Sequence, residues 1–247
     1  MRIFIIRHGD PYYPTDSLTE KGKREAALLG ARLVKENVTH VYLSPLGRAQ
    51  LTAKPLLDRT GIEPTVLPWL REFPASFEPQ FANETRLTSP KKTACPWNTP
   101  PEVWSSLPEI FTPDGWRQTE SFGSQKIQTA YDNICAGWDA LLAEHGYTRD
   151  GNIYRIAEGA EEKHECLALF CHLGMGNALL SHLMGLSLVA VWHTLFLPTS
   201  SVTTVYMERH LDKPVAHPRL ISVGDTSHLY AGREPVSASG LHTDKIE

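Results

Sequence analysis

Apolar and polar residues alternate in blocks along the first part of the chain, and the blocks have the lengths of strands and helices. Residues 2–6 are apolar apart from Arg2 and rich in β-branched side chains, which predicts a buried strand. Residues 38–43 and 64–67 predict two further short strands, and apolar residues recur at helical spacing between them. The order strand, helix, strand, helix, strand predicts an α/β protein with a parallel sheet and helices on its faces.

Two short polar motifs indicate where these helices begin. Ser17 precedes Glu20 by three residues, a capping-box pattern that predicts Ser17 as the N-cap of the first helix. Ser44 is followed by Pro45, which predicts Ser44 as the second N-cap and Pro45 as the first helical residue. Both motifs place a helix between successive strands.

The pattern of strands and helices is interrupted between residues 73 and 117. Proline is frequent in this stretch, which excludes long helices and central strands. Trp97, Trp104 and Trp116 lie between the prolines, and disordered segments are poor in aromatic residues. We therefore expect an ordered cap insertion packed on the main body, of the kind that often forms lids or binding loops.

The second half of the chain returns to regular elements. Residues 119–145 carry apolar positions at helical spacing, and the polar stretch 147–165 suggests a hairpin. Residues 166–171 (CLALFC) form a continuous apolar run, which predicts a buried strand. Two late strands are expected at 200–207 and 219–223.

The whole chain is interpreted as one domain, residues 1–247, with the cap insertion 73–117 within it. Its expected fold class is a three-layer α/β architecture with a mostly parallel central sheet flanked by helices. The polar residues 233–247 are expected to be frayed.

Composition and charge are those of an ordinary globular protein. Hydrophobic residues make up 41% and charged residues 21% of the 247 residues, which excludes collagen-like, coiled-coil and wholly disordered chains. Lys and Arg number 24 against 28 Asp and Glu, and the resulting charge of -4 argues against a nucleic-acid binder.

Features of membrane and secreted proteins are missing from the sequence. No apolar run approaches the roughly 18 residues of a membrane helix, and the N-terminus lacks the features of a signal peptide. The four cysteines form no C-x-x-C pair and are too few for a disulfide scaffold. We therefore expect a reduced, cytoplasmic protein with no membrane or nucleic-acid partner; the oligomeric state stays open.

Two of the predicted buried strands end in similar tripeptides. The first runs into Arg7-His8-Gly9, and the run 166–171 leads into His172-Leu173-Gly174. In an open α/β sheet, ligands bind beyond the carboxyl ends of the strands, so parallel neighbours would place both histidines in one crevice. Gly9 would allow backbone N–H groups to approach a ligand, and the helix after His172 would direct its positive N-terminus there.

Arg7 and Arg48 add fixed positive charge, because their forked donors match phosphate oxygens. Two imidazoles, two guanidinium groups and a helix N-terminus would bind a phosphoryl dianion. Nearby cations disfavour protonation of an imidazole, which keeps a nitrogen lone pair available for attack on phosphorus.

Several motifs together resemble the histidine phosphatase superfamily, which is also called phosphoglycerate-mutase-like. The motifs are RHG after the first strand, SLTEKG, SPLGRAQLTA, LREF, HLGMGNALLSHLMG, PTSSVTTV and DTSHL. They occur in family order and cover nearly all of the chain outside the insertion. The resemblance implies a mixed, mostly parallel sheet flanked by helices, with the insertion as a cap.

The resemblance also implies roles for particular residues. His8 would be phosphorylated during turnover, while Arg7, Arg48 and His172 hold the phosphoryl group. Glu72, in LREF, would be the general acid that protonates the leaving oxygen and then activates water. Gly9 and Leu173 border the two histidines and complete the predicted phosphate-binding residues. No metal and no cofactor are implied.

This sequence departs from the family pattern at two places. Leu173 stands where many members have Gly, so the backbone or the pocket wall there is expected to differ. The loop 10–16 is shorter than in the mutases and lacks the asparagine that helps to hold phosphate. Thr15 or Ser17 could substitute, although Ser17 is better explained as a cap. Both departures count against phosphoglycerate mutase activity.

Glu72 is the assignment with the most alternatives. It could instead form a surface ion pair with Arg71, its neighbour in sequence. Glu78, Glu109 or Asp114 in the insertion could then supply the acid.

Other candidate sites are weaker. His182, His193 and His228 are interpreted as structural, and His164-Glu165 lacks the second histidine of a zincin. Gly174-Met175-Gly176 imitates a dinucleotide fingerprint but lacks its third glycine and its acidic partner.

The leading hypothesis is a metal-independent phosphomonoester phosphatase that acts through phosphohistidine on a small phosphorylated metabolite. Its partners would be a small-molecule phosphate ester and inorganic phosphate. The alternatives are a phosphoglycerate-mutase-type phosphotransferase and a catalytically idle protein that binds phosphorylated ligands. Sugar phosphates, nucleotides and other phosphorylated metabolites all remain possible substrates.

Overall fold

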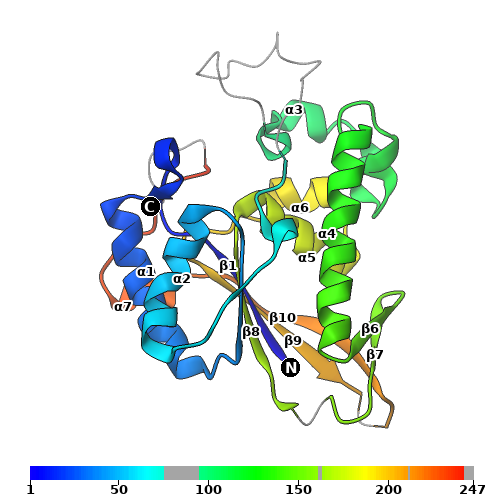
Figure 1. Ribbon diagram of the computed structural model, residues 1–247. Coiled ribbons are helices and arrows are strands. Elements are labelled where there is room, and N and C mark those ends of the chain that lie inside the picture. The colour runs from blue at the N-terminus through cyan, green and yellow to red at the C-terminus, as the bar shows by residue number, and fades with distance from the viewer. Residues whose placement is uncertain (75–94, 161–162, 211, 242–247) are drawn as a thin grey trace.

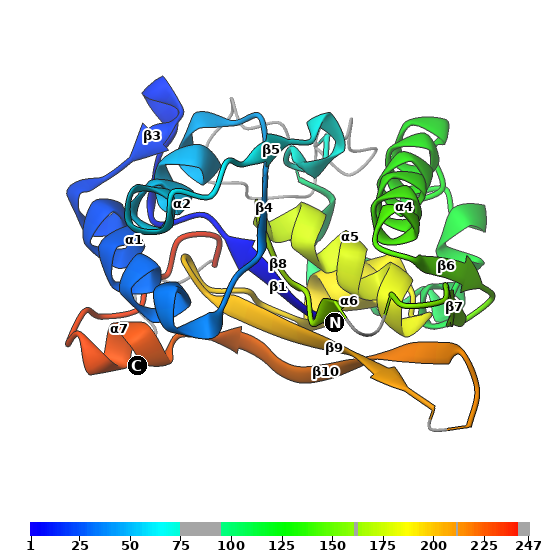
Figure 2. The same cartoon turned by 60° about the horizontal axis from the view of Figure 1, so that its bottom comes forward.

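One mixed sheet of eight strands runs through the molecule, with helices on both of its faces (Figures 1 and 2). The structure is a computed structural model, and it describes residues 1–74, 95–160, 163–210 and 212–241. The strand order is β5-β4-β8-β1-β9-β10-β7-β6. This arrangement confirms the predicted α/β class with a sheet between two helical layers.

One half of the sheet is parallel, and its strands are those predicted from the apolar runs. They are β5 (Thr65–Val66), β4 (His40–Leu43), β8 (Cys166–Cys171) and β1 (Arg2–Arg7). β1 and β8 pair in register from Arg2 opposite Cys166 to Arg7 opposite Cys171. The residues that follow the two strands therefore emerge side by side.

The other half of the sheet is antiparallel. β9 pairs with β1, and β10, β7 and β6 follow outward. Their bounds are Val202–Arg209 for β9, Val215–Asp225 for β10, Ile153–Ile156 for β7 and Tyr147–Asp150 for β6. β6 and β7 form the hairpin expected within 147–165. A small second sheet joins β2 (Pro11–Tyr12) to β3 (Ser17–Leu18).

Helices cover the two faces in separate groups (Figure 1). One group is α1 (Glu20–Leu33), α2 (Gly47–Thr60) and α7 (Ser227–Ala231). The other is α4 (Gln125–Glu144), α5 (Leu173–Met184) and α6 (Leu188–Thr194). Side chains of β1 alternate between them, since Ile3 and Ile5 join one core and Phe4 and Ile6 the other. None of the helices in the described ranges is long and apolar enough to cross a membrane.

The described part of the predicted cap insertion consists of short helical turns. α3 (Pro101–Trp104) is accompanied by the 3-10 turns η4 (Pro96–Asn98), η5 (Pro108–Phe111) and η6 (Gly115–Gln118). Trp116 and Ile110 are fully buried, and the Trp104 ring stacks on His193 of α6 at 4.9 Å. Residues 75–94 of the insertion, and with them the alternative acid Glu78, lie outside the described residues.

Both predicted N-caps are wrong. Ser17 pairs with Tyr12 in the small sheet, and α1 is capped instead by Thr19, whose Oγ1 accepts from Gly22 N at 3.0 Å. α2 begins at Gly47, so Pro45 lies before the helix and Ser44 does not cap it. Each helix begins later than the local motif predicts, because Ser17 pairs in a strand and residues 44–46 lie before the helix.

The prediction that the C-terminal residues are frayed is wrong for residues 233–241. Glu234 pairs with Lys21 at 3.0 Å and with Arg24 at 2.7 Å. Ser237 Oγ donates to Asp10 Oδ1 at 2.5 Å. These contacts hold the segment across the loop that follows β1. Residues 242–247 lie outside the described residues.

Replacement of Thr19 tests the corrected cap. We expect Thr19→Ala to lower the free energy of unfolding by about 1 kcal/mol, because the Gly22 N–H loses its acceptor. Urea unfolding followed by circular dichroism measures the change. Ser17→Ala is the matched control and should stay within about 0.5 kcal/mol of the wild type. The opposite ranking of the two variants would restore Ser17 as the cap.

Candidate active site

His8 and His172 follow the paired ends of β1 and β8 and lie side by side. Their ring centroids are 5.1 Å apart, with the ring planes at 58°. Both side chains are buried, with 2% and 0% of the residue surface exposed. The structure therefore brings together two imidazoles that are far apart in sequence, at the edge of the sheet where the parallel strands end.

The surroundings of His8 determine which of its ring nitrogens is available. Nδ1 lies 2.7 Å from the Gly9 carbonyl oxygen, which can only accept, so Nδ1 carries the proton and donates. Nε2 is left with its lone pair. Burial lowers the pKa of His8 well below 6.5, and the positive charges of Arg7 and Arg48 lower it further, while the hydrogen bond to Gly9 opposes them. The neutral nucleophilic form is favoured.

Ser44 holds the ring of His172. Ser44 Oγ accepts from Leu46 N at 3.2 Å and lies 2.7 Å from His172 Nε2, to which the hydroxyl can donate or from which it can accept. When Ser44 donates, Nδ1 of His172 carries the proton; Nδ1 is buried without a hydrogen-bond partner among the described residues. Burial lowers the pKa of His172 well below 6.5, and His8 and the two arginines add to the effect. The neutral form of His172 is therefore favoured, with Nδ1 as a donor in the first of these two arrangements.

Arg7 is anchored by backbone carbonyls. Its Nη1 donates to Leu197 O at 2.6 Å and its Nη2 donates to Ser239 O at 2.7 Å. Both Nη groups are therefore engaged by the protein, and of the guanidinium nitrogens only Nε is left for a phosphate oxygen. Nε remains buried and unpartnered within the described chain. Burial lowers the pKa of this guanidinium.

Arg48 lies in the first turn of α2 and is held by a residue that the sequence analysis missed. Asp16 Oδ1 accepts from Arg48 Nη1 at 2.5 Å, and Asp16 Oδ2 accepts from Gly47 N at 2.6 Å. The ring of Tyr13 lies 5.5 Å from Arg48 Cζ. Nε of Arg48 has no partner in the described ranges. The only sequence signal for Asp16 was the shortness of the loop 10–16.

Glu72 reaches the first turn of α5, directly after His172. Its Oε1 accepts from Phe73 N at 2.8 Å and from Met175 N at 3.0 Å. Burial raises the pKa of this carboxyl above 4.5, and the two backbone donors and the two arginines oppose the rise. The environment therefore suits a carboxyl group that exchanges a proton.

The structure also places Arg71, the alternative ion-pair partner of Glu72, and the alternative acids Glu109 and Asp114. Glu72 and its neighbour Arg71 form no ion pair, and Arg71 is exposed. Glu109 and Asp114 are also exposed, on the short turns of the insertion, and Asp114 pairs with Arg117 at 3.0 Å. No described contact links either residue to the histidines.

Gly9 and Leu173, which border the two histidines, both make close packing contacts. Gly9 N does not point to a ligand, because it donates to Thr52 Oγ1 at 2.9 Å. Gly9 is needed for packing, since a Cβ there would lie 2.8 Å from the carbonyl oxygen of Gly22. Leu173 opens α5 and is nearly buried, and a Cβ on Gly240 would lie 3.3 Å from its Cδ2. Leu173 therefore forms a wall against the C-terminal segment.

Three residues near His8 each have a buried nitrogen without a partner in the described chain: Arg7 Nε, Arg48 Nε and His172 Nδ1. A buried polar group without a partner costs roughly 1–3 kcal/mol, and more when it is charged. The N-terminus of α5 adds a partial positive charge beside His172. The oxygens of an anion are acceptors of the kind that such donors bind.

The histidines interpreted as structural have local partners. His182 Nε2 contacts Asp139 Oδ1 at 3.0 Å, His193 Nδ1 donates to Val189 O at 2.7 Å, and His228 Nε2 lies 3.2 Å from Ser200 Oγ. Gly174, in the pattern that only imitates a dinucleotide fingerprint, lies against the insertion, since a Cβ there would lie 2.3 Å from the indole of Trp97. This glycine allows packing of the insertion.

Comparison with known proteins agrees with this geometry. The model of the histidine phosphatase superfamily (branch 1) matches residues 3–111. A probable phosphoglycerate mutase, GpmB, of Yersinia enterocolitica is 36% identical over 81 residues. That alignment covers 29% of this chain and 38% of the relative, so the chain spans well under half the length of the curated relative. The resemblance of the sequence to this superfamily is confirmed.

Solved structures of similar fold extend the comparison beyond residue 111. A phosphoserine phosphatase variant of Entamoeba histolytica in complex with phosphoserine has a TM-score of 0.57 at 18% identity, covering 92% of this chain and 98% of that one. A mycobacterial glucosyl-3-phosphoglycerate phosphatase has a TM-score of 0.57 at 21% identity, covering 90% and 97%. At these identities the similarity establishes the fold.

The lowered pKa of His8 gives a pH prediction. We expect its imidazole to stay neutral at pH values well below 6.5, because burial and two guanidinium groups disfavour the charged form. Nitrogen NMR of the histidine rings measures the midpoint, with His8→Gln used to assign the resonance. A midpoint at or above 6.5 would contradict the expectation.

The same shift predicts how stability depends on pH. Below about pH 6.5 the unfolded chain binds a proton at this position while the folded chain does not, so the free energy of unfolding falls as the pH is lowered. The fall should be shallower in His8→Gln.

Proposed function

Because residues 3–111 match the histidine phosphatase superfamily, we propose that this protein is a phosphomonoester phosphatase that acts through a phosphohistidine on His8. One observation carries the proposal. His8 Nε2 keeps its lone pair, the ring of His172 lies 5.1 Å away, the charges of Arg7 and Arg48 act on His8, and each of these three neighbours has a buried nitrogen without a partner in the described chain. Their number and charge suit the oxygens of a phosphoryl group.

In the first step, His8 Nε2 attacks phosphorus and the ester P–O bond breaks. The protonated carboxyl of Glu72 gives its proton to the leaving oxygen, so that an alcohol departs rather than an alkoxide. Arg7, Arg48 and His172 donate to the oxygens that gain charge in the transition state. The Nδ1–H bond from His8 to Gly9 persists and balances the positive charge on the ring.

In the second step, water attacks the phosphohistidine. The carboxylate of Glu72 accepts a proton from this water, the P–N bond breaks, and its electron pair returns to Nε2. Inorganic phosphate leaves, and Glu72 is protonated for the next cycle. The guanidinium groups supply the charge neutralisation, so the mechanism is independent of metal ions.

The substrate proposed is a small phosphorylated metabolite. Structural neighbours include a phosphoserine phosphatase and a glucosyl-3-phosphoglycerate phosphatase, whose names point to small phosphate esters. Trp97 of the insertion packs on the first turn of α5, close to Glu72, so the insertion borders the leaving-group side. We infer that residues 73–117 act as a cap within a single domain, 1–247.

We also propose that the protein works in a reduced, cytoplasmic compartment. All four cysteines are free thiols, which suits a reducing compartment.

A mutase is the second candidate, favoured by the match to a probable phosphoglycerate mutase. Interconversion of phosphoglycerates without release of phosphate would favour this candidate over a phosphatase.

Replacement of His8 tests the nucleophile. We expect His8→Ala to hydrolyse an aryl phosphate at least about 10³-fold more slowly than the wild type, with chelator present in both assays. Wild-type protein quenched during turnover of a phosphorus-labelled substrate should carry an acid-labile label that the variant lacks. Circular dichroism checks that the variant is folded. Equal turnover by the two proteins would refute the mechanism.

Replacement of Glu72 tests the acid. We expect Glu72→Gln to lose roughly 10²–10⁴-fold with an alkyl phosphate and less with a nitrophenyl phosphate, whose leaving group needs no proton. Glu109→Gln is the matched control and should leave both rates unchanged. Equal losses with the two esters would mean that another residue protonates the leaving group.

A further inference from the structure

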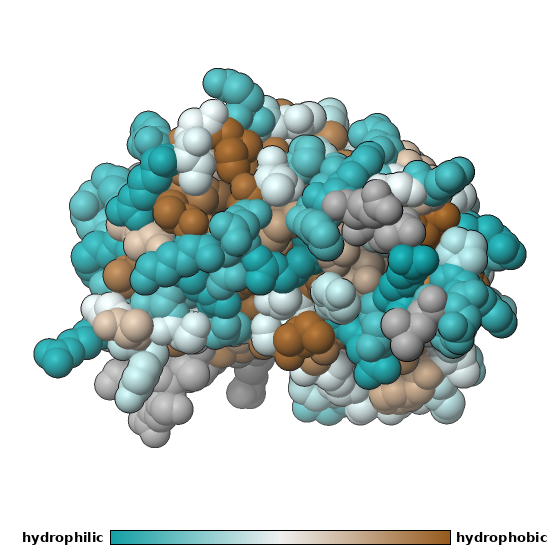
Figure 3. Space-filling model, turned by 90° about the horizontal axis from the view of Figure 1, so that it is seen from below, coloured by the Kyte–Doolittle hydropathy of each residue, from teal (hydrophilic) through white to brown (hydrophobic). Residues whose placement is uncertain are grey.

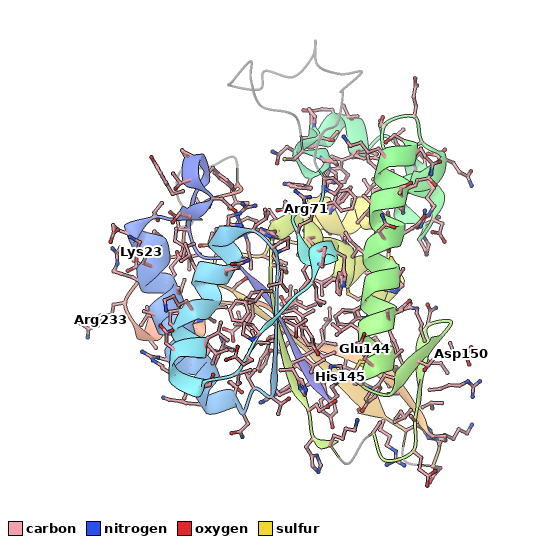
Figure 4. All side chains as sticks on the ribbon, in the orientation of Figure 1. Lys23, Arg71, Glu144, His145, Asp150 and Arg233 are labelled. Atoms are coloured by element: carbon pink, nitrogen blue, oxygen red, sulfur yellow. The ribbon has the colours of Figure 1, made fainter. Side chains whose placement is uncertain are left out.

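A second cluster of metal-ligating side chains lies at the opposite end of the sheet from His8. His40 is the first residue of β4, Glu165 directly precedes β8, and His145 ends α4. Figure 4 labels His145 at the lower end of α4, far from Arg71, which neighbours Glu72 at the upper end. Seven residues of extended chain separate Glu165 from His172, a distance of about 20 Å. The phosphoryl chemistry proposed above does not use this cluster.

The three side chains converge closely. One potential ligand atom from each lies within 4.8 Å of the others. His145 Nδ1 lies 2.8 Å from Glu165 Oε2, and the rings of His40 and His145 meet edge to face with centroids 4.9 Å apart. Bonds of about 2.0–2.2 Å from a tetrahedral zinc ion place its ligand atoms about 3.3 Å apart, so small side-chain shifts would complete the geometry.

Neighbouring residues orient both imidazoles as in metal sites. Tyr42 O–H lies 2.7 Å from His145 Nε2, and a phenol can either donate to this nitrogen or accept from it. When Nε2 carries the proton and donates to Tyr42, Nδ1 presents its lone pair toward Glu165. Thr39 Oγ1 lies 2.9 Å from His40 Nδ1, and a bond donated there by His40 leaves Nε2 free. Such outer hydrogen bonds fix the tautomer of ligating histidines.

We propose that His40, His145 and Glu165 bind one divalent transition-metal ion of the zinc class. Two imidazole nitrogens and one carboxylate oxygen suit zinc, cobalt or nickel, whereas magnesium and calcium prefer oxygen ligands alone. The ion takes the place of the proton that lies between His145 Nδ1 and Glu165 Oε2. When Nε2 already carries a proton of its own, the displaced proton leaves to solvent. Water completes the coordination.

The site is within reach of solvent. His40 and Glu165 are half-buried, while His145 is buried behind them. Figure 3 views the molecule from this end, and hydrophilic residues cover most of that face, with separate hydrophobic patches between them. An ion would link three segments that are distant in sequence.

Metal titration of untagged, chelator-treated protein tests the proposal. We expect one equivalent of Zn²⁺ to bind by calorimetry, and Co²⁺ to give the visible absorption of a low-coordinate site. His40→Ala and Glu165→Gln should weaken Zn²⁺ binding at least tenfold. His217→Ala is the matched control, because His217 is also partly exposed beside a carboxylate, Glu208 at 3.1 Å, and it should bind as the wild type does.

Three results would overturn the metal site: no saturable binding of either ion, unchanged affinity in His40→Ala and Glu165→Gln, or an equal loss in His217→Ala. Circular dichroism confirms that each variant is folded. Aryl phosphatase activity is measured on the same chelator-treated samples. It should persist without metal, so the fate of the phosphatase proposal is read separately from that of the metal site.

Discussion

The parallel pairing of β1 with β8 is the constraint on which the rest of this site depends. Because Arg7 lies opposite Cys171, the next residue of each strand is a histidine, and the two rings meet at 5.1 Å. A register shift of one residue would turn one imidazole to the other face of the sheet. Buried apolar side chains on both faces of β1 and β8 hold this register, so the hydrophobic core directly positions His8, the proposed nucleophile.

Burial of two guanidinium groups is the main electrostatic cost of this arrangement, and the fold offsets it in two ways. The charge of Arg7 is stabilised by the carbonyl dipoles of Leu197 and Ser239, whereas Arg48 is paired with the carboxylate of Asp16. Each guanidinium keeps one unpartnered Nε within the described chain. The positive charge of the two guanidinium groups is therefore only partly compensated. The remaining charge disfavours protonation of His8.

The two ends of the sheet present different chemistry. At the carboxyl ends of the parallel strands, donors and a helix N-terminus converge on one point, which suits an anion. At the amino ends, two imidazoles and a carboxylate converge, which suits a cation. The two proposed sites would therefore bind ions of opposite sign, and the strands between them keep the sites about 20 Å apart.

The sequence by itself determined the elements and the residues that end them: the apolar runs of β1 and β8, the βαβ order, and Arg7, His8 and His172 at the strand ends. These features depend on periodicity and on short motifs, which are local. Only the tertiary structure decided that Ser44 orients His172, that Asp16 holds Arg48, that residues 237–239 reach Arg7, and that His40 meets His145 and Glu165. It also moved the helix cap from Ser17 to Thr19. These contacts join segments up to 232 positions apart or reflect competition between strand pairing and capping. Long-range contacts and this competition leave no periodic signal in the sequence, because packing of the whole sheet determines which residues meet.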